Sequence, residues 1–149
     1  MIIDSHLHVW SLETNRYPFA GKGTTEEGSA ELLLETMEKA GVDKACIVQP
    51  IHYLYDNTYV GDVVRAFPDT FSAIAIMDRH RPDAADELER LVTEDGFEGV
   101  RMHLARPDDP AEWAAPDQYP IWERAESLSA SFLSFGPAEV ASSTGITLS

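Results

Sequence analysis

Short apolar runs typical of strands alternate along this chain with segments whose apolar residues recur at helical spacing. This order predicts an alternation of strands and helices. Short apolar runs, rich in β-branched and aromatic residues, indicate strands. Such runs begin at Ile2 and Ile3 and recur at residues 44–48, 71–76 and 99–104, with a fifth candidate at residues 130–135. The first and third runs are expected to be buried, because near-continuous apolar runs are typical of strands that are covered on both faces.

Between these runs, apolar residues recur at the spacing of one helix face. The four faces are Leu33, Met37 and Ala40; Val60, Val63, Val64 and Phe67; Ala84, Leu88, Leu91 and Val92; and Ile121, Ala125 and Leu128. Ser29 and Asp83 stand where N-caps are expected. Helix stops are indicated by Gly41, Pro68 and Gly96. Four repeats of strand and helix predict an α/β fold with parallel strands and right-handed crossovers.

Length, net charge and cysteine content limit the size of the fold, its binding partners and its compartment. The chain has 149 residues, 44% of them apolar, which is enough for one domain with a core. Its net charge of −15 argues against binding nucleic acid or an anionic membrane. The single cysteine, Cys46, lies in an apolar run, which favours a buried structural thiol in a reducing compartment. With no signal-peptide pattern at the start, we expect a cytoplasmic protein.

Two histidines follow the first apolar run. His6 and His8 are two positions apart, so on a strand their side chains project to the same side. Two adjacent imidazoles at a strand end can hold a divalent metal, since imidazole suits zinc, iron and nickel. The alternative is coincidence, because two ligands are only half of a usual four-ligand site.

Polar side chains also follow the second strand and line the fourth. Gln49 and His52 come after residue 48 and are candidates for substrate contact or for an internally hydrogen-bonded loop; we expect the neighbouring pair Asp56–Asn57 to cap the next helix. Arg101 and His103 share one face of the strand at residues 99–104. Arg101 suits a substrate carboxylate, or alternatively a salt bridge at the same end of the sheet.

Two loops are long. In the first, residues 11–28, the run Tyr17-Pro18-Phe19 either packs over the end of the sheet or fastens the loop to the surface. The second, residues 106–118, carries three prolines. The exit of the third strand, Asp78-Arg79-His80-Arg81, is expected to be a solvated loop; the alternative is that His80 reaches the site.

The motifs together resemble a known family. The opening Ile2-Ile3-Asp4-Ser5-His6-Leu7-His8-Val9-Trp10, followed by Arg16-Tyr17-Pro18-Phe19, is similar to the start of the amidohydrolase-related, metal-dependent hydrolases with a TIM-barrel fold. Val48-Gln49-Pro50-Ile51-His52-Tyr53 and the segment at residues 96–104 match that family's second and fourth strand regions. The likeness is collinear over about residues 1–128 and is nearest to the sugar-lactone and dicarboxylate lactonase branch.

The resemblance implies a chemistry. His6 and His8 would be the catalytic, metal-binding pair; the metal, expected to be zinc, would activate water for attack on a lactone or other carbonyl. Arg101, His103, Gln49 and His52 would contact a small substrate that bears carboxylate or hydroxyl groups. Some lactonase-like relatives work without metal, the histidines then polarising the carbonyl. Alternatives are a metal-dependent decarboxylase or hydratase of the same family, or an inactive fragment or interaction module.

The likeness also has a limit. A complete barrel needs roughly 250 residues, and this chain is expected to be the N-terminal half, about four and a half βα units. Residues 1–128 form the partial barrel and residues 129–149 an atypical tail, in which the fifth strand lacks the family's further histidine ligand. The later histidine and aspartate have no counterpart, so we expect a truncated or frame-shifted product. Open sheet edges invite self-association. The alternatives to truncation are a homo-oligomer that covers these edges and closes a barrel, or an open sheet with the tail lying across it.

Overall fold

A computed structural model describes residues 1–103 and 109–135 of the chain. Strands and helices alternate in chain order, and two short 3₁₀ segments lie in the connections. The elements are β1 (Ile3–Leu7), α1 (Ala30–Ala40), β2 (Lys44–Val48), η1 (Ile51–Tyr53), α2 (Thr58–Ala66), β3 (Phe71–Ala75), α3 (Ala84–Thr93), β4 (Gly99–His103), α4 (Asp109–Trp113), η2 (Pro116–Gln118), α5 (Tyr119–Leu128) and β5 (Ser131–Phe135).

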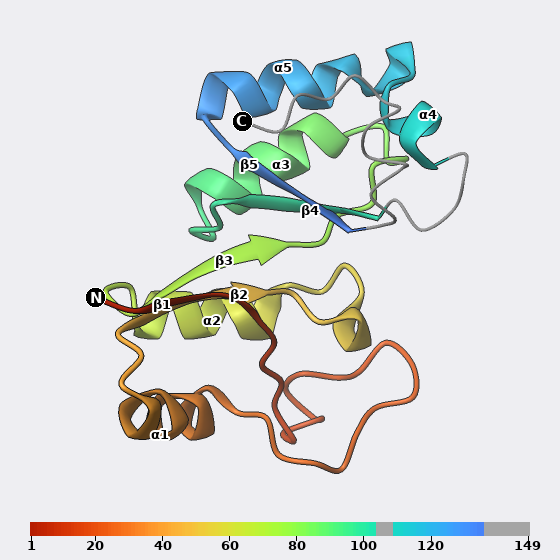
Figure 1. Cartoon of the computed structure of the whole chain (residues 1–149). Helices are drawn as coiled ribbons and strands as arrows, with labels where there is room; N and C mark the ends of the chain where they lie inside the picture. Colours follow the sequence, from red (N-terminus) through yellow and green to blue (C-terminus); the bar gives the residue numbers. More distant parts are fainter. Residues whose placement is uncertain (104–108, 136–149) are drawn as a thin grey trace.

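The strands form one parallel sheet in the order β1-β2-β3-β4-β5, so each strand pairs with its neighbours in the sequence. Figure 1 shows α1 and α2 beside the β1–β2 end of the sheet, and α3 and α5 beside the β4–β5 end. A helix between successive parallel strands is the usual crossover connection. The predicted α/β fold with parallel strands is confirmed, and the fifth strand is present.

One face of the sheet packs against the helices. Alternate strand residues share a single apolar cluster with helix residues; its members include Ala45, Ile47, Ala73, Val100 and Met102 from the strands and Val60, Leu88, Leu91 and Ile121 from the helices. Because strand side chains alternate between faces, the residues between these strand positions project to the opposite face. Arg101, between Val100 and Met102, is therefore directed away from the helices.

The helix ends follow local sequence signals, with two exceptions. Ser29 caps α1 by accepting a hydrogen bond from the Leu32 backbone N–H, and Gly41 ends that helix in the left-handed region at φ 70°. Asp83 occupies the N-cap position of α3, but its carboxylate pairs with Arg81 at 2.7 Å and makes no capping bond. The expected side-chain cap is therefore absent there.

The second exception is at the start of α2. Asp56 Oδ1 accepts hydrogen bonds from the Thr58 backbone N–H at 3.1 Å and from the Thr58 hydroxyl at 2.5 Å. Asn57 occupies the N-cap position without capping, because its amide binds the backbone of Ile76 instead. Of the predicted capping pair, only Asp56 caps.

Burial of the first strand was predicted wrongly. Ile2 is 58% exposed and Ile3 is 53% exposed. Within the described residues β1 pairs with β2 alone and forms one edge of the sheet, so its apolar residues are covered on one side only. The expected burial of the third run is confirmed, since only Ser72 in β3 is partly exposed.

The second long loop was also only partly predicted. It contains the one-turn helix α4 and the 3₁₀ segment η2, where prolines near the first position are compatible with a helical start. Residues 104–108, including the predicted last residue of the fourth strand, and residues 136–149 of the predicted tail lie outside the described residues. No helix among the described segments is long and apolar enough to cross a membrane.

Candidate metal and substrate site

The two histidines lie together at the carboxyl end of β1. Their ring centroids are 5.2 Å apart and their planes are nearly perpendicular, at 86°. The strand is irregular here: from the pair Asp4–Ala45 to the pair Leu7–Ile47, β1 advances three residues while β2 advances two. An extra residue of this kind re-aims side chains and is frequent beside active sites. His6 and His8 nevertheless come close, as their spacing predicts.

A backbone carbonyl fixes the ring of His8. Its Nδ1 lies 2.7 Å from the carbonyl oxygen of Val48, the last residue of β2. A carbonyl only accepts hydrogen bonds, so Nδ1 carries a proton, and in the neutral imidazole the lone pair is then on Nε2. This second contact is typical of histidine ligands of metals, since it sets both the tautomer and the ring orientation.

The surroundings of His6 favour the neutral imidazole. Partial burial, followed by the positive charges of His8 and Arg101, lowers the pKa of His6, while the carboxylate of Asp4 opposes this change. Asp4 also accepts a hydrogen bond from the His6 backbone N–H at 3.1 Å. A lowered pKa leaves the imidazole unprotonated near pH 7, which is the form that binds a metal.

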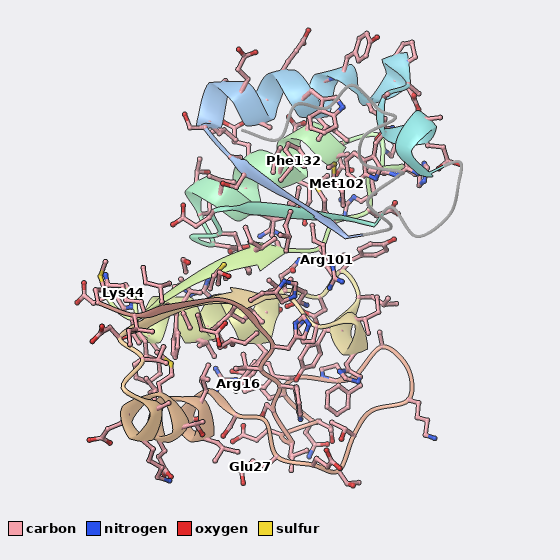
Figure 2. All side chains as sticks on the ribbon, in the orientation of Figure 1. Arg16, Glu27, Lys44, Arg101, Met102 and Phe132 are labelled. Carbon is pink, nitrogen blue, oxygen red and sulfur yellow. The ribbon has the colours of Figure 1, made fainter. Side chains whose placement is uncertain are left out.

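Arg101 brings a cation to the same region from β4. It is only 8% exposed, and burial lowers the pKa of its guanidinium. Its charge acts on His6, which places the two side chains within electrostatic reach of each other. Figure 2 shows Arg101 in the middle of the molecule, between the part that carries β1 and β2 and the part that carries β4 and β5. A guanidinium in this position suits the carboxylate of a small ligand.

Gln49 supports the β2–α2 connection. Its side chain is fully buried, and Nε2 donates a hydrogen bond to the backbone oxygen of Asp56 at 2.7 Å. This contact agrees with the alternative that Gln49 belongs to an internally hydrogen-bonded loop. Its Oε1 is buried and has no hydrogen-bond partner among residues 1–103 and 109–135, so substrate contact stays a prediction.

His52 lies in an aromatic group at the same end of the sheet. The rings of Trp10 and Phe19 are both 5.9 Å from the His52 ring, each at an interplanar angle of 63°. Its Nδ1 is buried, with no hydrogen-bond partner in the described part of the chain. Trp10 is two residues beyond His8 in the sequence.

The remaining predicted residues are not brought to the histidine pair by the described contacts. His103 is the last residue of β4, and its side chain is not among the described ones. His80 is exposed, and its backbone N–H donates to Asp78 Oδ1 at 3.0 Å, as expected for a solvated loop. Arg79 departs from that expectation: it pairs with Glu112 and its guanidinium carbon lies 5.1 Å from the ring centroid of Trp113.

The first long loop is fastened to the helical side of the molecule. Tyr17 donates a hydrogen bond to Asp62 of α2 at 2.7 Å, and Arg16 donates one to the same carboxylate oxygen at 3.1 Å. Tyr17 is therefore an anchor, which was one of the two roles considered for the segment, while Phe19 packs toward His52. The role of Asp62 was not anticipated, because nothing in its sequence context separates it from other helical carboxylates.

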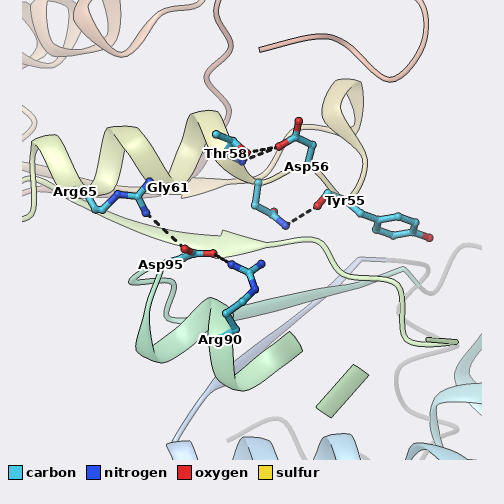
Figure 3. A pocket seen from close by; sticks show the side chains of 8 residues that line it. Tyr55, Asp56, Thr58, Gly61, Arg65, Arg90 and Asp95 are labelled. Carbon is cyan, nitrogen blue, oxygen red and sulfur yellow. Dashed lines mark hydrogen bonds and ion pairs between the residues drawn. The ribbon is translucent and has the colours of Figure 1, made fainter. Parts of the chain in front are cut away.

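A separate hollow of about 250 Å³ lies between α2 and α3. Figure 3 shows two arginines in it that share one carboxylate: Asp95 contacts Arg65 at 3.7 Å and Arg90 at 2.5 Å. These cations are neutralised within the hollow. It also lies away from the histidine pair, so we do not assign it to the candidate site.

The donor set fits two positions of a metal site. The lone pairs of His6 and His8 suit a divalent transition metal. Among the described residues there is no group of three or more histidine, cysteine, aspartate or glutamate side chains that would complete it. The described geometry therefore supplies half of an ordinary coordination sphere, as expected from two ligands.

A parallel half-barrel with metal-binding residues at a strand end is typical of barrel hydrolases and related enzymes. The family model Amidohydro_2, described as amidohydrolase, matches residues 3–138. The chain belongs to this amidohydrolase family, as the resemblance of its motifs implied.

Solved structures agree on the fold. A probable 2-pyrone-4,6-dicarboxylic acid hydrolase from Acinetobacter baumannii, solved with citric acid bound, is 21% identical with a TM-score of 0.74, covering 93% of this chain and 51% of that one. The 2,6-dihydroxybenzoate decarboxylase from Rhizobium is 20% identical with a TM-score of 0.64, covering 88% and 48%. A 5-carboxyvanillate decarboxylase from Novosphingobium aromaticivorans, a D314N mutant with bound manganese, is 16% identical with a TM-score of 0.65, covering 89% and 49%.

This chain therefore spans about half the length of the solved structures that it resembles. The predicted fold class, the N-terminal half of a TIM (β/α)8 barrel with parallel strands, is confirmed.

Proposed function

We propose that this chain carries the N-terminal part of the active site of a metal-assisted hydrolase, which acts on a lactone or a related carbonyl compound that bears a carboxylate. The observation that carries the proposal is the histidine pair. His6 and His8 meet at 5.2 Å between ring centroids, and the Val48 carbonyl leaves Nε2 of His8 available to a metal.

His6 and His8 would hold the divalent cation, zinc or manganese. When bound, the cation supplies Lewis acidity, which polarises a carbonyl and makes water more acidic. The pKa of His6 is lowered by burial and by neighbouring positive charge, which favours its neutral imidazole. Nδ1 of His8 donates its proton to the Val48 carbonyl, so Nε2 is the nitrogen of His8 that would bind the metal.

Arg101 would orient the substrate. Its guanidinium is largely withdrawn from water, where a bidentate pair with a carboxylate is stronger than on the surface. The similar structure from Acinetobacter baumannii holds citric acid, which supports a carboxylate-bearing ligand. His52, Gln49 and His103 would then contribute further contacts to the ring or to the hydroxyl groups of the substrate.

Decarboxylation is the second candidate, because similar structures include decarboxylases, one of them with manganese. We prefer hydrolysis because the hydrolase from Acinetobacter baumannii superposes with a TM-score of 0.74 and the two decarboxylases with 0.64 and 0.65. In a metal-free hydrolase the histidines would polarise the carbonyl themselves, and hydrolysis would then continue after chelation.

The test combines metal binding with turnover on the full chain. Purified protein is stripped with a chelator, titrated with Mn²⁺ or Zn²⁺, and assayed on 2-pyrone-4,6-dicarboxylate and on simple sugar lactones. His6→Ala and His8→Ala each remove one donor, and His80→Ala is the matched control because His80 is exposed on another loop. Mn²⁺ binding is followed by electron paramagnetic resonance, independently of catalysis.

We expect hydrolysis to require metal, and both binding and turnover to be lost in His6→Ala and His8→Ala but kept in His80→Ala. Hydrolysis that survives complete chelation would refute the role of the metal and favour histidine polarisation. Equal metal binding by His8→Ala and His80→Ala would refute the site itself. Release of CO₂ from a hydroxybenzoate, without lactone hydrolysis, would select the decarboxylase.

A further inference from the structure

The β1–α1 loop, residues 11–28, is a compact unit whose two ends meet. Trp10 N donates a hydrogen bond to the Gly28 oxygen at 2.8 Å, and Trp10 Nε1 donates one to the Glu26 oxygen at 2.8 Å. A side chain at Gly28 would overlap the Trp10 ring, and one at Gly23 would overlap the ring of Phe19. The loop backbone therefore packs directly on the rings of Trp10 and Phe19.

One carboxylate on α2 collects the polar contacts of this loop. Tyr17 donates to Asp62 Oδ2 at 2.7 Å, and Arg16 donates to the same oxygen at 3.1 Å. The other oxygen, Oδ1, accepts from Arg65 of α2 itself at 2.6 Å. Asp62 thus has two donors from the loop and one from its own helix.

Tyr17 is the buried member of these contacts. Tyr17 is 6% exposed, and its ring centroid lies 4.9 Å from that of Tyr59 on α2. Burial alone would raise the pKa of Asp62, but the hydrogen bonds from Tyr17 and Arg65 hold that pKa below its ordinary value. The carboxylate is therefore ionised at neutral pH, and charge-assisted hydrogen bonds of this kind are stronger than neutral ones.

Beyond the anchor, the same loop reaches the candidate site. Phe19 stacks on Tyr53 with ring centroids 5.1 Å apart and an interplanar angle of 27°. The backbone N–H of Ala20 donates to the His52 oxygen at 2.8 Å. His52 also contacts Trp10, which is two residues beyond His8 in the sequence. The loop therefore contacts His52, one of the residues expected to bind substrate.

We propose that Asp62 is a positioning residue: by holding Tyr17 and Arg16 it keeps the β1–α1 loop in place as one wall of the substrate site. That the loop serves as a wall of the substrate site rests on the proposed function. The anchoring itself rests only on the contacts of Asp62, so the two parts can be tested separately.

The anchoring is tested by limited proteolysis of the full chain with trypsin, identifying the cleavage sites by mass. Lys22 is the reporter, because it lies in the loop and takes no part in the Asp62 contacts. Asp62→Asn weakens both loop contacts. Arg65→Gln is the matched control, since it removes the helical partner of the same carboxylate and leaves both loop donors.

We expect Asp62→Asn to raise the rate of cleavage after Lys22 by about tenfold. Loss of roughly one charge-assisted hydrogen bond would increase the open population of the loop by about this factor. Arg65→Gln should leave this rate within about twofold of the wild type, because an exposed ion pair contributes little. Adding Tyr17→Phe to Asp62→Asn should have a smaller effect than Tyr17→Phe alone, since both changes act on the same contact. Equal rates in Asp62→Asn and Arg65→Gln, or a rise at all tryptic sites together, would overturn the anchoring.

The role of the wall is tested with citrate binding and, where turnover is measured, with KM and kcat. Asp62→Asn should weaken citrate binding and raise KM severalfold with kcat little changed, and Asp62→Glu should restore part of the affinity. Faster cleavage at Lys22 with unchanged citrate affinity would refute the wall. Failure of the proposed function has a different signature, because the wild type itself would then bind neither metal nor citrate.

Discussion

Asn57 joins the start of α2 to the end of β3, and replacing it should be costly. Its Nδ2 donates to the Ile76 oxygen at 2.8 Å and to the Tyr55 oxygen at 3.1 Å, and its Oδ1 accepts from the Ile76 N–H at 3.0 Å. Asn57 is 7% exposed and Ile76 is 3% exposed. Asn57→Ala would leave the N–H and C=O of Ile76 without these partners, away from water.

The magnitude follows from those two groups. A buried backbone donor or acceptor that loses its partner costs about 1–3 kcal/mol. Two such groups, with partial relaxation, predict a loss of about 2–4 kcal/mol, a large part of the roughly 5–15 kcal/mol that holds an ordinary domain folded. For a chain of this size, each kcal/mol lowers Tm by about 2–4 °C, so we expect Tm to fall by about 4–16 °C.

Urea denaturation followed by circular dichroism measures this loss directly. Asn15→Ala is the matched control, because Asn15 is an exposed loop residue and such substitutions usually change stability by less than about 0.5 kcal/mol. The midpoint should shift in Asn57→Ala without a change in slope. A loss no larger than that of Asn15→Ala would contradict the reasoning, since it would mean that the Ile76 groups do not depend on Asn57.

Two further predictions concern the sheet and the loop anchor. Gly99→Ala should destabilise the pairing of β4 with β5 by more than about 2 kcal/mol, because a side chain there would overlap the backbone oxygen of Ser131; hydrogen exchange at β5 should accelerate, and unchanged protection would count against the overlap. Burial, followed by the hydrogen bond to Asp62, raises the pKa of Tyr17 from 10.0 to about 12. Since the folded-state pKa is the higher one, its contribution to stability is complete below pH 10 and is lost as the pH rises toward 12. The difference in unfolding free energy between wild type and Tyr17→Phe should shrink over that range, and a constant difference would disprove the assignment.

Much of the fold was predictable because periodicity reports burial. Helix α2 was predicted from the apolar spacing of Val60, Val63 and Val64, and the structure buries these residues on that helix. The end of α1 was predicted from Gly41, which the structure places at the C-cap. Both signals depend only on local geometry. Ile2 and Ile3 were misjudged because burial depends on which strand lies alongside, and periodicity within one strand carries no such information. The helix α4 was missed because a one-turn helix in a proline-rich segment has too few positions to show a period.

The site was predictable to the extent that it depends on neighbours in the sequence. The approach of His6 to His8 follows from strand alternation. The contact of His8 with Val48 and the contacts of Tyr17 and Arg16 with Asp62 join residues that are far apart along the chain. A single sequence contains no signal that pairs such residues. Long-range polar contacts of this kind are what the three-dimensional structure adds.

The histidine pair also depends on the register of β1. The extra residue between Asp4 and Leu7 lies where His6 is located, and it is followed at once by the contact of His8 with the end of β2. Slipping a strand by one residue moves each side chain to the other face, so loss of this irregularity would detach His8 from Val48. Any change that straightens β1 should therefore reduce metal affinity before it reduces stability, because the edge strand contributes little apolar burial but supplies both described donors.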